Sequence, residues 1–189
     1  MADKAKLIVV SGPSGVGKTT LLKKLLDEYK ERIVFSVSFT SRSPRINEKN
    51  GKDYFFVSKE EFESDIIKGM FLEYAVVHGN YYGTSKKFIE NVLESGRDCL
   101  LDIDVQGGLN LMSKKIDAMF IFIAPPSFDA LKKRLENRST DSEEVILKRL
   151  NDARFELEQK DKYDYIVVNN SLGRAYEELK QIILKRRGE

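Results

Sequence analysis

The sequence predicts an α/β fold in which a parallel β-sheet is flanked by helices. Four short apolar runs, 7–10, 99–103, 118–124 and 165–168, are separated by segments with helical periodicity. Short apolar strands that alternate with helices indicate a parallel sheet covered on both faces. Two further observations refine this fold: a phosphate-binding pattern follows the first strand, and a β-rich segment interrupts the chain before the second apolar run.

The composition is that of an ordinary soluble protein. The 189 residues suffice for one well-packed domain with a small insertion, and the net charge of +2 gives no reason to expect nucleic-acid binding. The single cysteine, Cys99, lies in an apolar run, which favours a buried, inert thiol. Because the sequence contains neither a signal segment nor an apolar run of membrane-spanning length, we expect a cytoplasmic protein, monomeric or homodimeric, without membrane partners.

The first strand leads into residues 12–19, which fit the pattern of glycine, any four residues, then Gly-Lys-Ser/Thr. Backbone N–H groups of such a loop surround a polyphosphate, and the positive end of the following helix adds to the attraction. In this pattern Lys18 reaches the β- and γ-phosphates, and the hydroxyl of Thr19 ligates Mg²⁺. The alternative is a glycine turn that only joins a strand to a helix. The Lys-Thr pair and the helical spacing of Leu22, Leu25 and Leu26 argue for the phosphate site.

After the first helix, the segment from about 38 to 84 has a different character. Strand-like stretches and one short helical stretch surround a polar loop that contains arginine and glycine. We expect strands at 34–38, 54–57, 71–77 and 81–82, and a helix at 61–68. Such material between two core elements predicts an inserted subdomain, with a second substrate bound between it and the phosphate loop.

Two arginines of this insert, Arg42 and Arg45, flank Pro44, whose stiff backbone restricts their separation. Two guanidinium groups held close together can clamp a phosphate, with tyrosine hydroxyls completing the shell. A solvated basic loop explains the same pattern equally well.

Seven stretches occur in a fixed order: SGPSGVGKT at 11–19, FSVS at 35–38, RSPR at 42–45, NGKDY at 50–54, GNYYG at 79–83, LDIDVQG at 101–107 and IAPP at 123–126. As a set they resemble the guanylate kinase family over essentially the whole chain. The resemblance implies a P-loop kinase fold with a core (1–37, 85–133 and 157–189), an inserted small mixed α/β GMP-binding subdomain (about 38–84) and a helical lid (about 134–156). It also implies Mg²⁺-dependent transfer of the ATP γ-phosphoryl group to GMP, and to dGMP, giving GDP and ADP.

The resemblance also assigns binding residues. ATP would contact Gly12, Pro13, Ser14, Gly15, Val16, Gly17, Lys18, Thr19, Thr20, Arg138 and Arg149. GMP would contact Ser38, Arg42, Arg45, Tyr54, Glu73, Tyr82, Thr84 and Asp104. The chemistry is consistent with guanine, since a carboxylate accepts from both N1–H and the N2 amino group while hydroxyls donate to O6. Taken alone, Glu73 could be an ordinary glutamate on a strand.

Catalysis and metal binding are expected from a small set of charged residues. The resemblance gives catalytic roles to Lys18, Arg42, Arg138 and Arg149, and a metal site to Thr19 and Asp102. Asp102 would hold Mg²⁺ through water, whereas Asp104 would lie toward GMP; an Asp-x-Asp pair after a strand could also cap a helix. Arg134, one helical turn before Arg138, could be only a solvent-facing side chain.

Two departures from the family pattern concern packing. A glycine is common where Ser139 stands, and small hydroxyl residues are usual where Phe39 stands.

Three rival functions share some of these features. A guanylate kinase-like protein-binding module without catalysis would typically carry a degraded phosphate loop, which is intact here. A kinase for another nucleoside monophosphate would not need Ser38, Glu73 and Thr84. A GTPase switch would need an Asn-Lys-x-Asp motif, which the sequence lacks.

Overall fold

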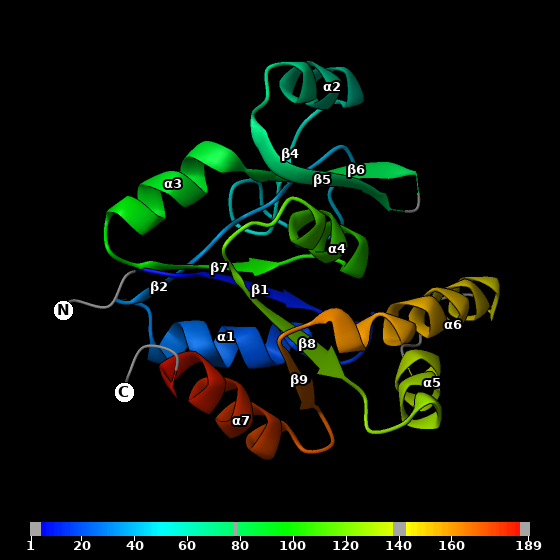
Figure 1. Ribbon diagram of the computed structural model, residues 1–189. Coiled ribbons are helices and arrows are strands. Elements are labelled where there is room, and N and C mark those ends of the chain that lie inside the picture. Colours follow the sequence, from blue (N-terminus) through cyan, green and yellow to red (C-terminus); the bar gives the residue numbers. More distant parts are fainter. Residues whose placement is uncertain (1–4, 78, 138–142, 186–189) are drawn as a thin grey trace.

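The computed structural model describes residues 5–77, 79–137 and 143–185 (Figure 1). Its core is a five-stranded sheet in the order β2-β7-β1-β8-β9, and every neighbouring pair is parallel. The strands are β1 (Leu7–Ser11), β2 (Ile33–Phe35), β7 (Asp98–Asp102), β8 (Met119–Ala124) and β9 (Tyr165–Val168). The four predicted apolar runs match four of these strands within one residue at each end, and the predicted α/β class is confirmed.

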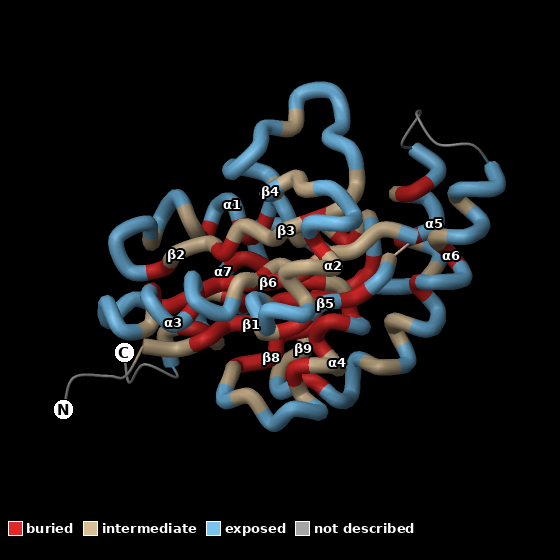
Figure 2. Tube along the Cα trace, turned by 90° about the horizontal axis from the view of Figure 1, so that it is seen from above, coloured by how far each residue is buried: buried red, intermediate tan, exposed pale blue. Residues whose placement is uncertain are grey.

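Helices cover both faces of this sheet, as the alternation of strand side chains requires. Ile8 and Val10 pack toward α1 (Lys18–Glu28) and α7 (Leu172–Lys185). Leu7 and Val9 point to the opposite face, which α3 (Lys86–Glu94) and α4 (Val105–Ser113) cover. Figure 2 shows the resulting buried segments gathered in the middle of the molecule. Cys99 is buried there, as expected for an inert thiol.

A second sheet lies beyond α4 and has the order β4-β3-β6-β5. Its strands are β3 (Phe39–Thr40), β4 (Phe55–Phe56), β5 (Phe71–Val77) and β6 (Asn80–Ser85), and the helix α2 (Lys59–Ile67) connects β4 to β5. A capping box between Ser58 and Glu61 starts α2. This mixed sheet is formed by the segment in which the sequence predicts an insertion.

The predicted strand at 34–38 was wrong in its extent, because the chain leaves the core sheet after Phe35 and joins the second sheet only at Phe39. The ring of Phe39 stacks on Phe55 with centroids 4.8 Å apart, and meets Phe71 edge-on at 5.6 Å. Phe39 therefore belongs to an aromatic cluster that holds the second sheet together, which accounts for a large residue at this position.

Two hydrogen bonds connect α4 to the second sheet. The side chain of Asn110 donates to the carbonyl of Tyr74 at 3.3 Å, and Lys114 donates to the carbonyl of Leu72 at 2.9 Å. Because α4 also packs on the core sheet through Leu111, one helix contacts both sheets.

At one end of the molecule, α5 (Phe128–Glu136) and α6 (Glu143–Glu158) lie side by side, followed by the short helix η1 (Lys160–Lys162) (Figure 1). Leu131 and Leu135 of α5 pack against Leu150 and Ala153 of α6 in a small separate cluster. Arg138 and Ser139 lie outside the described residues. Within the described parts of the chain, no helix combines the length and apolar character needed to cross a membrane.

Candidate functional site

The loop between β1 and α1 is supported from behind. Gly17 has φ 98° and directly precedes Lys18, the first residue of α1. The carbonyl of Val16 accepts from Asn169 Nδ2 at 2.8 Å and from Arg134 Nη1 at 3.3 Å. A Cβ at Gly17 would lie 2.5 Å from the same Asn169 nitrogen, so both the backbone angle and the space require glycine. Arg134 is therefore not a free solvent-facing side chain but part of the support of this loop.

A cavity of about 420 Å³ opens above the loop. The loop and the start of α1, the second sheet, and the residues after β7 all contribute to its walls. The predicted site residues that line it are Gly12, Pro13, Ser14, Gly15, Gly17, Lys18, Thr19, Thr20, Ser38, Arg45, Tyr54, Glu73, Tyr82, Asp102 and Asp104. The fold thus brings together predicted site residues that are up to 92 positions apart, from Gly12 to Asp104.

Four other predicted residues do not line this cavity. Val16 is fully buried with its side chain in the core, and Thr84 is buried behind Glu73. Arg42 lies one hydrogen bond away, through Tyr82, and Arg149 is on α6.

On the loop side, the side chain of Lys18 turns back on its own loop. Its Nζ donates to the carbonyl of Gly12 at 2.5 Å. Burial raises the pKa of the Asp102 carboxyl, and the positive charge of Lys18 opposes this shift. The two groups therefore act on each other within the cavity, beside the hydroxyl-bearing Thr19.

On the side of the second sheet, Glu73 on β5 is only 3% exposed. Thr84 Oγ1 donates to Glu73 Oε1 at 2.6 Å. Burial raises the pKa of Glu73 to about 7; the hydrogen bond from Thr84 opposes the shift and the charge of Asp104 adds to it. A Cβ on Gly107 of α4 would come within 2.8 Å of Glu73 Oε2, so a glycine is needed where the helix passes the carboxylate.

Asp104 occupies the N-cap of α4, and its carboxylate accepts from the backbone N–H of Gly107 at 2.6 Å. Helix capping, the alternative that the Asp-x-Asp pattern left open, is thus one function of this residue. Asp104 also lines the cavity, so capping does not remove it from the site.

The guanidinium group of Arg42 is held by a carboxylate that the sequence analysis missed. Its Nη1 and Nη2 donate to the two oxygens of Glu48 at 2.9 and 3.0 Å, and its Nε donates to Tyr82 Oη at 3.2 Å. These hydrogen bonds raise the pKa of Arg42, and the guanidinium lowers the pKa of the Glu48 carboxyl. Glu48 also accepts from the backbone N–H of Arg45 at 2.7 Å, three residues earlier, so a local turn positions it.

Tyr54 completes this side of the cavity. Its ring lies 5.8 Å from that of Tyr82, and the guanidinium of Arg42 lies 5.4 Å from the ring centroid. Burial raises the pKa of the Tyr54 hydroxyl. The phenol of Tyr82 and the carboxyl group of Asp102 raise it further. The hydroxyl is therefore neutral and able to donate a hydrogen bond at physiological pH.

The sequence analysis also missed the carboxylate of Glu156 of α6, which lines the cavity. The sequence signal that could have identified it is its spacing: Glu156 follows Arg149 by seven residues, or two helical turns, which places both on one face of the helix.

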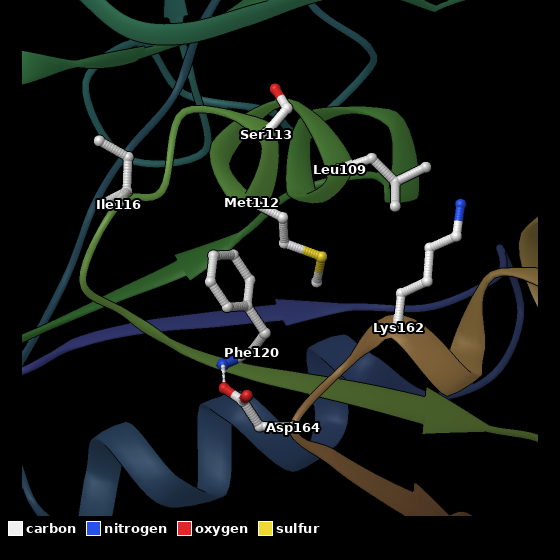
Figure 3. Close-up of a pocket in the computed structure, with 7 residues that line it drawn as sticks. All are labelled: Leu109, Met112, Ser113, Ile116, Phe120, Lys162 and Asp164. Carbon is white, nitrogen blue, oxygen red and sulfur yellow. Dashed lines mark hydrogen bonds between the residues drawn. The ribbon is translucent and has the colours of Figure 1, made fainter.

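A second hollow lies between α4 and the η1–β9 segment (Figure 3). Its volume of about 700 Å³ exceeds that of the first cavity, and its walls mix apolar side chains with polar and charged ones. They consist of Leu109, Met112, Ser113, Ile116, Phe120, Lys162 and Asp164, and one carboxylate oxygen of Asp164 is engaged by the N–H of Phe120 at 2.9 Å. None of the predicted site residues lies there, so the cavity above the loop is the candidate functional site.

Comparison with known proteins identifies the family of the chain. A family model described as guanylate kinase matches residues 4–186. A protein from Oryza sativa subsp. japonica described as guanylate kinase 1 is 49% identical over 186 residues, which are 97% of the present chain and 49% of the rice protein. The chain thus spans about half the length of that relative.

A guanylate kinase from Geobacter metallireducens is 45% identical over 187 residues, covering 99% of the present chain and 92% of the bacterial one. The crystal structure of guanylate kinase from Anaplasma phagocytophilum has a TM-score of 0.79 and 34% identity, and the match covers 100% of the present chain and 89% of that chain. The chain described here therefore belongs to the guanylate kinase family of nucleoside monophosphate kinases.

Proposed function

We propose that the chain transfers the γ-phosphoryl group of ATP to GMP, and to dGMP, in a reaction that requires Mg²⁺ and gives GDP and ADP. The observation that carries this proposal is the single cavity whose walls combine the phosphate loop with Arg45 and the buried Glu73. A phosphate loop alone would fit many nucleotide-binding proteins. A buried carboxylate facing the same space supports an acceptor that presents hydrogen-bond donors.

In this proposal Glu73, Thr84 and Ser38 recognise the guanine base. The ionised carboxylate of Glu73 accepts from N1–H and from the N2 amino group, and the hydroxyls serve O6. Adenine has no N1 donor and no O6 acceptor, so it would leave buried polar groups unpaired at a cost of about 1–3 kcal/mol each. Guanine is therefore preferred over adenine, because adenine leaves these buried polar groups without hydrogen-bond partners.

The phosphate of GMP is held by Arg42, Arg45, Tyr54 and Tyr82. Arg45 and the tyrosines already face the cavity. Arg42 binds the phosphate by exchanging the carboxylate of Glu48 for phosphate oxygens, since both present paired oxygen acceptors to the planar guanidinium.

The donor nucleotide binds along the loop, with its β- and γ-phosphates at Lys18 and Mg²⁺ near Thr19 and Asp102. The donor set suits a hydrated Mg²⁺, because one hydroxyl and one carboxyl group, of Thr19 and Asp102, line the same cavity. Mg²⁺ commonly keeps several waters and uses one or two protein carboxylates together with substrate phosphates. When bound, the ion neutralises charge on the phosphates during transfer.

Transfer is completed by a lid of about residues 134–156. Arg149 on α6 approaches the ATP phosphates when the lid closes, together with Arg138, which lies outside the described residues. No general base is needed, since the acceptor is already an anionic phosphate and the reaction depends mainly on alignment and charge neutralisation.

The same proposal includes three further points: GMP-binding subdomain bounds of about 38–84, a cytoplasmic location, and a monomeric or homodimeric state.

The alternative is a catalytically inactive guanylate kinase-like module that binds a protein partner. The intact Lys18 and Thr19 in the cavity wall argue against it.

A coupled assay of ADP formation tests the proposal, with ATP, Mg²⁺ and GMP, AMP, CMP, UMP or dTMP as the acceptor. We expect turnover with GMP at least about 10²-fold above that with AMP, because AMP leaves at least two buried groups unpaired. Turnover with AMP but not with GMP would contradict the guanine assignment. Binding of GMP without turnover on any acceptor would favour the inactive module.

A further inference from the structure

The carboxylate of Glu156 has no part in the reaction as proposed, yet it lines the nucleotide cavity together with Lys18 and Asp104. Among the described residues that line this cavity, only Glu156 comes from α6. Its side chain forms no hydrogen bond that would engage it elsewhere in the described parts of the chain. A charged group placed in this way acts on whatever enters the cavity.

Packing fixes the position of Glu156. Ala153, three residues earlier, is buried against Leu131 and Leu135 of α5, and Leu157, the next residue, packs into the core cluster beneath α4. Arg149 lies on the same face of α6, seven residues or about 10 Å further along the helix axis. Glu156 therefore stands at the base of the proposed lid, where the helix joins the core, and reaches the cavity in the structure as it is.

The electrostatic surroundings of Glu156 are those of the donor site. Burial raises the pKa of Glu156 to about 7; the positive charge of Lys18 opposes the shift, whereas Asp104 and Asp152 add to it. Asp102, Asp104 and Glu156 thus place three carboxyl groups in the cavity that Lys18 also lines, and the charge of Lys18 acts on Asp102 and on Glu156. A polyphosphate that enters without a cation brings further negative charge into this space, and partial burial weakens the screening by solvent.

We infer that Glu156 is a specificity-determining residue that makes the donor site favour the Mg²⁺-loaded nucleotide over the metal-free one. Its carboxylate repels a bare polyphosphate beside Lys18, and this repulsion is largely removed when Mg²⁺ accompanies the phosphates. The inference rests on the proposed function, because it requires a donor nucleotide on the loop. It assigns to α6 an electrostatic role that precedes lid closure and is separate from that of Arg149.

Equilibrium binding of ADP in the absence of GMP tests this inference. Isothermal titration calorimetry at pH 8.5, where Glu156 is ionised, would compare ADP with EDTA against ADP with excess Mg²⁺. For E156Q we expect metal-free ADP to bind about three- to tenfold more tightly than to the unaltered chain, while the affinity for Mg²⁺-ADP changes less than about twofold. The stimulation of binding by Mg²⁺ should fall accordingly.

Two control variants separate charge from structure. E158Q removes the charge of an exposed glutamate on the same helix that does not line the cavity, and should reproduce the unaltered chain. E156D retains the carboxylate and should keep most of the Mg²⁺ stimulation. The inference would be overturned if E156Q changed both affinities by the same factor, changed neither, or was matched by E158Q. Failure of the unaltered chain to bind ADP even with Mg²⁺ would instead overturn the proposed function, and this inference with it.

Discussion

The carboxyl group of Glu73 is buried before any ligand arrives, and this has a cost that depends on pH. Its pKa is raised to about 7 in the folded chain, so between its ordinary value of 4.5 and about 7 the unfolded chain has released a proton that the folded chain retains. The stabilising effect of this protonation is present below pH 4.5 and is lost as the pH rises through 7. At pH 8 the ionised Glu73 therefore destabilises the ligand-free fold.

E73Q should remove this penalty and weaken recognition at the same time. We expect E73Q to be more stable than the unaltered chain by roughly 1–3 kcal/mol at pH 8.5, with the difference shrinking toward pH 4.5. Urea unfolding at several pH values measures it. GMP should bind about 10- to 100-fold more weakly, since the amide cannot accept from two adjacent donors as a carboxylate does. A loss of stability that is the same at every pH would show that Glu73 is only a packing residue.

Individual site residues differ in how far the sequence could identify them. Lys18 stands in an ordered motif and Glu73 was assigned through the family resemblance, and both line the cavity. Glu48 was missed because an acidic residue in a polar loop usually faces solvent, and its role appears only when the turn after Arg45 brings it onto Arg42. Glu156 was missed because helical spacing alone does not say which face of α6 meets the cavity.

At the level of elements, the phosphate loop depends on contacts from the far edge of the core sheet. Gly17 must adopt φ 98° and leave room for Asn169, which follows β9. The loop motif was readable from the sequence, since its glycines and Lys-Thr pair are local. The support by Asn169 was not, because the two residues are 152 positions apart in the chain and meet only through the parallel order β1-β8-β9.

G17A should therefore lower stability and donor binding together. The left-handed backbone angle costs an alanine about 1–2 kcal/mol, and displacement of Asn169 adds to that loss. Thermal unfolding and ADP titration measure the two effects. G96A is the matched control, because Gly96 has a similar φ of 78° but open space where the Cβ would lie. If G17A and G96A lost equal stability and both kept ADP affinity, the contact with Asn169 would have no role in the loop.

The strands of the insert show a different limit of prediction. β5 matches its predicted range of 71–77 at both ends, since its aromatic and β-branched residues are local evidence. The break between β2 and β3 was not predicted, because Ser36, Val37 and Ser38 continue a strand-like pattern. β2 ends because the chain passes there from the core sheet to the second sheet, and this passage is a property of the tertiary fold.

At the scale of the whole molecule, α4 joins the two sheets around the site. Its N-cap residue Asp104 lines the cavity, its Gly107 passes Glu73, and its Asn110 and Lys114 hold β5. A ligand that binds Glu73 therefore acts on a helix that also packs in the core.

GMP should consequently stabilise the entire fold and not only the insert. At a concentration about 100 times its dissociation constant, a ligand that binds only the folded chain adds about 2.7 kcal/mol of stability. For a protein of this size that corresponds to a rise in Tm of roughly 5–10 °C, measurable by differential scanning calorimetry as one shifted transition. AMP at the same concentration is the control, and an equal shift with AMP would contradict base recognition by the insert.

Because Arg42 is paired with Glu48, binding of a phosphate at this arginine is an exchange of one anion for another. In the proposed reaction, the phosphate of GMP would displace a carboxylate that already satisfies the guanidinium of Arg42 through two hydrogen bonds. Salt weakens the pair that is broken as well as the pair that is formed, so the two effects partly cancel. The affinity for GMP should accordingly depend less on ionic strength than the number of arginines around its phosphate would suggest.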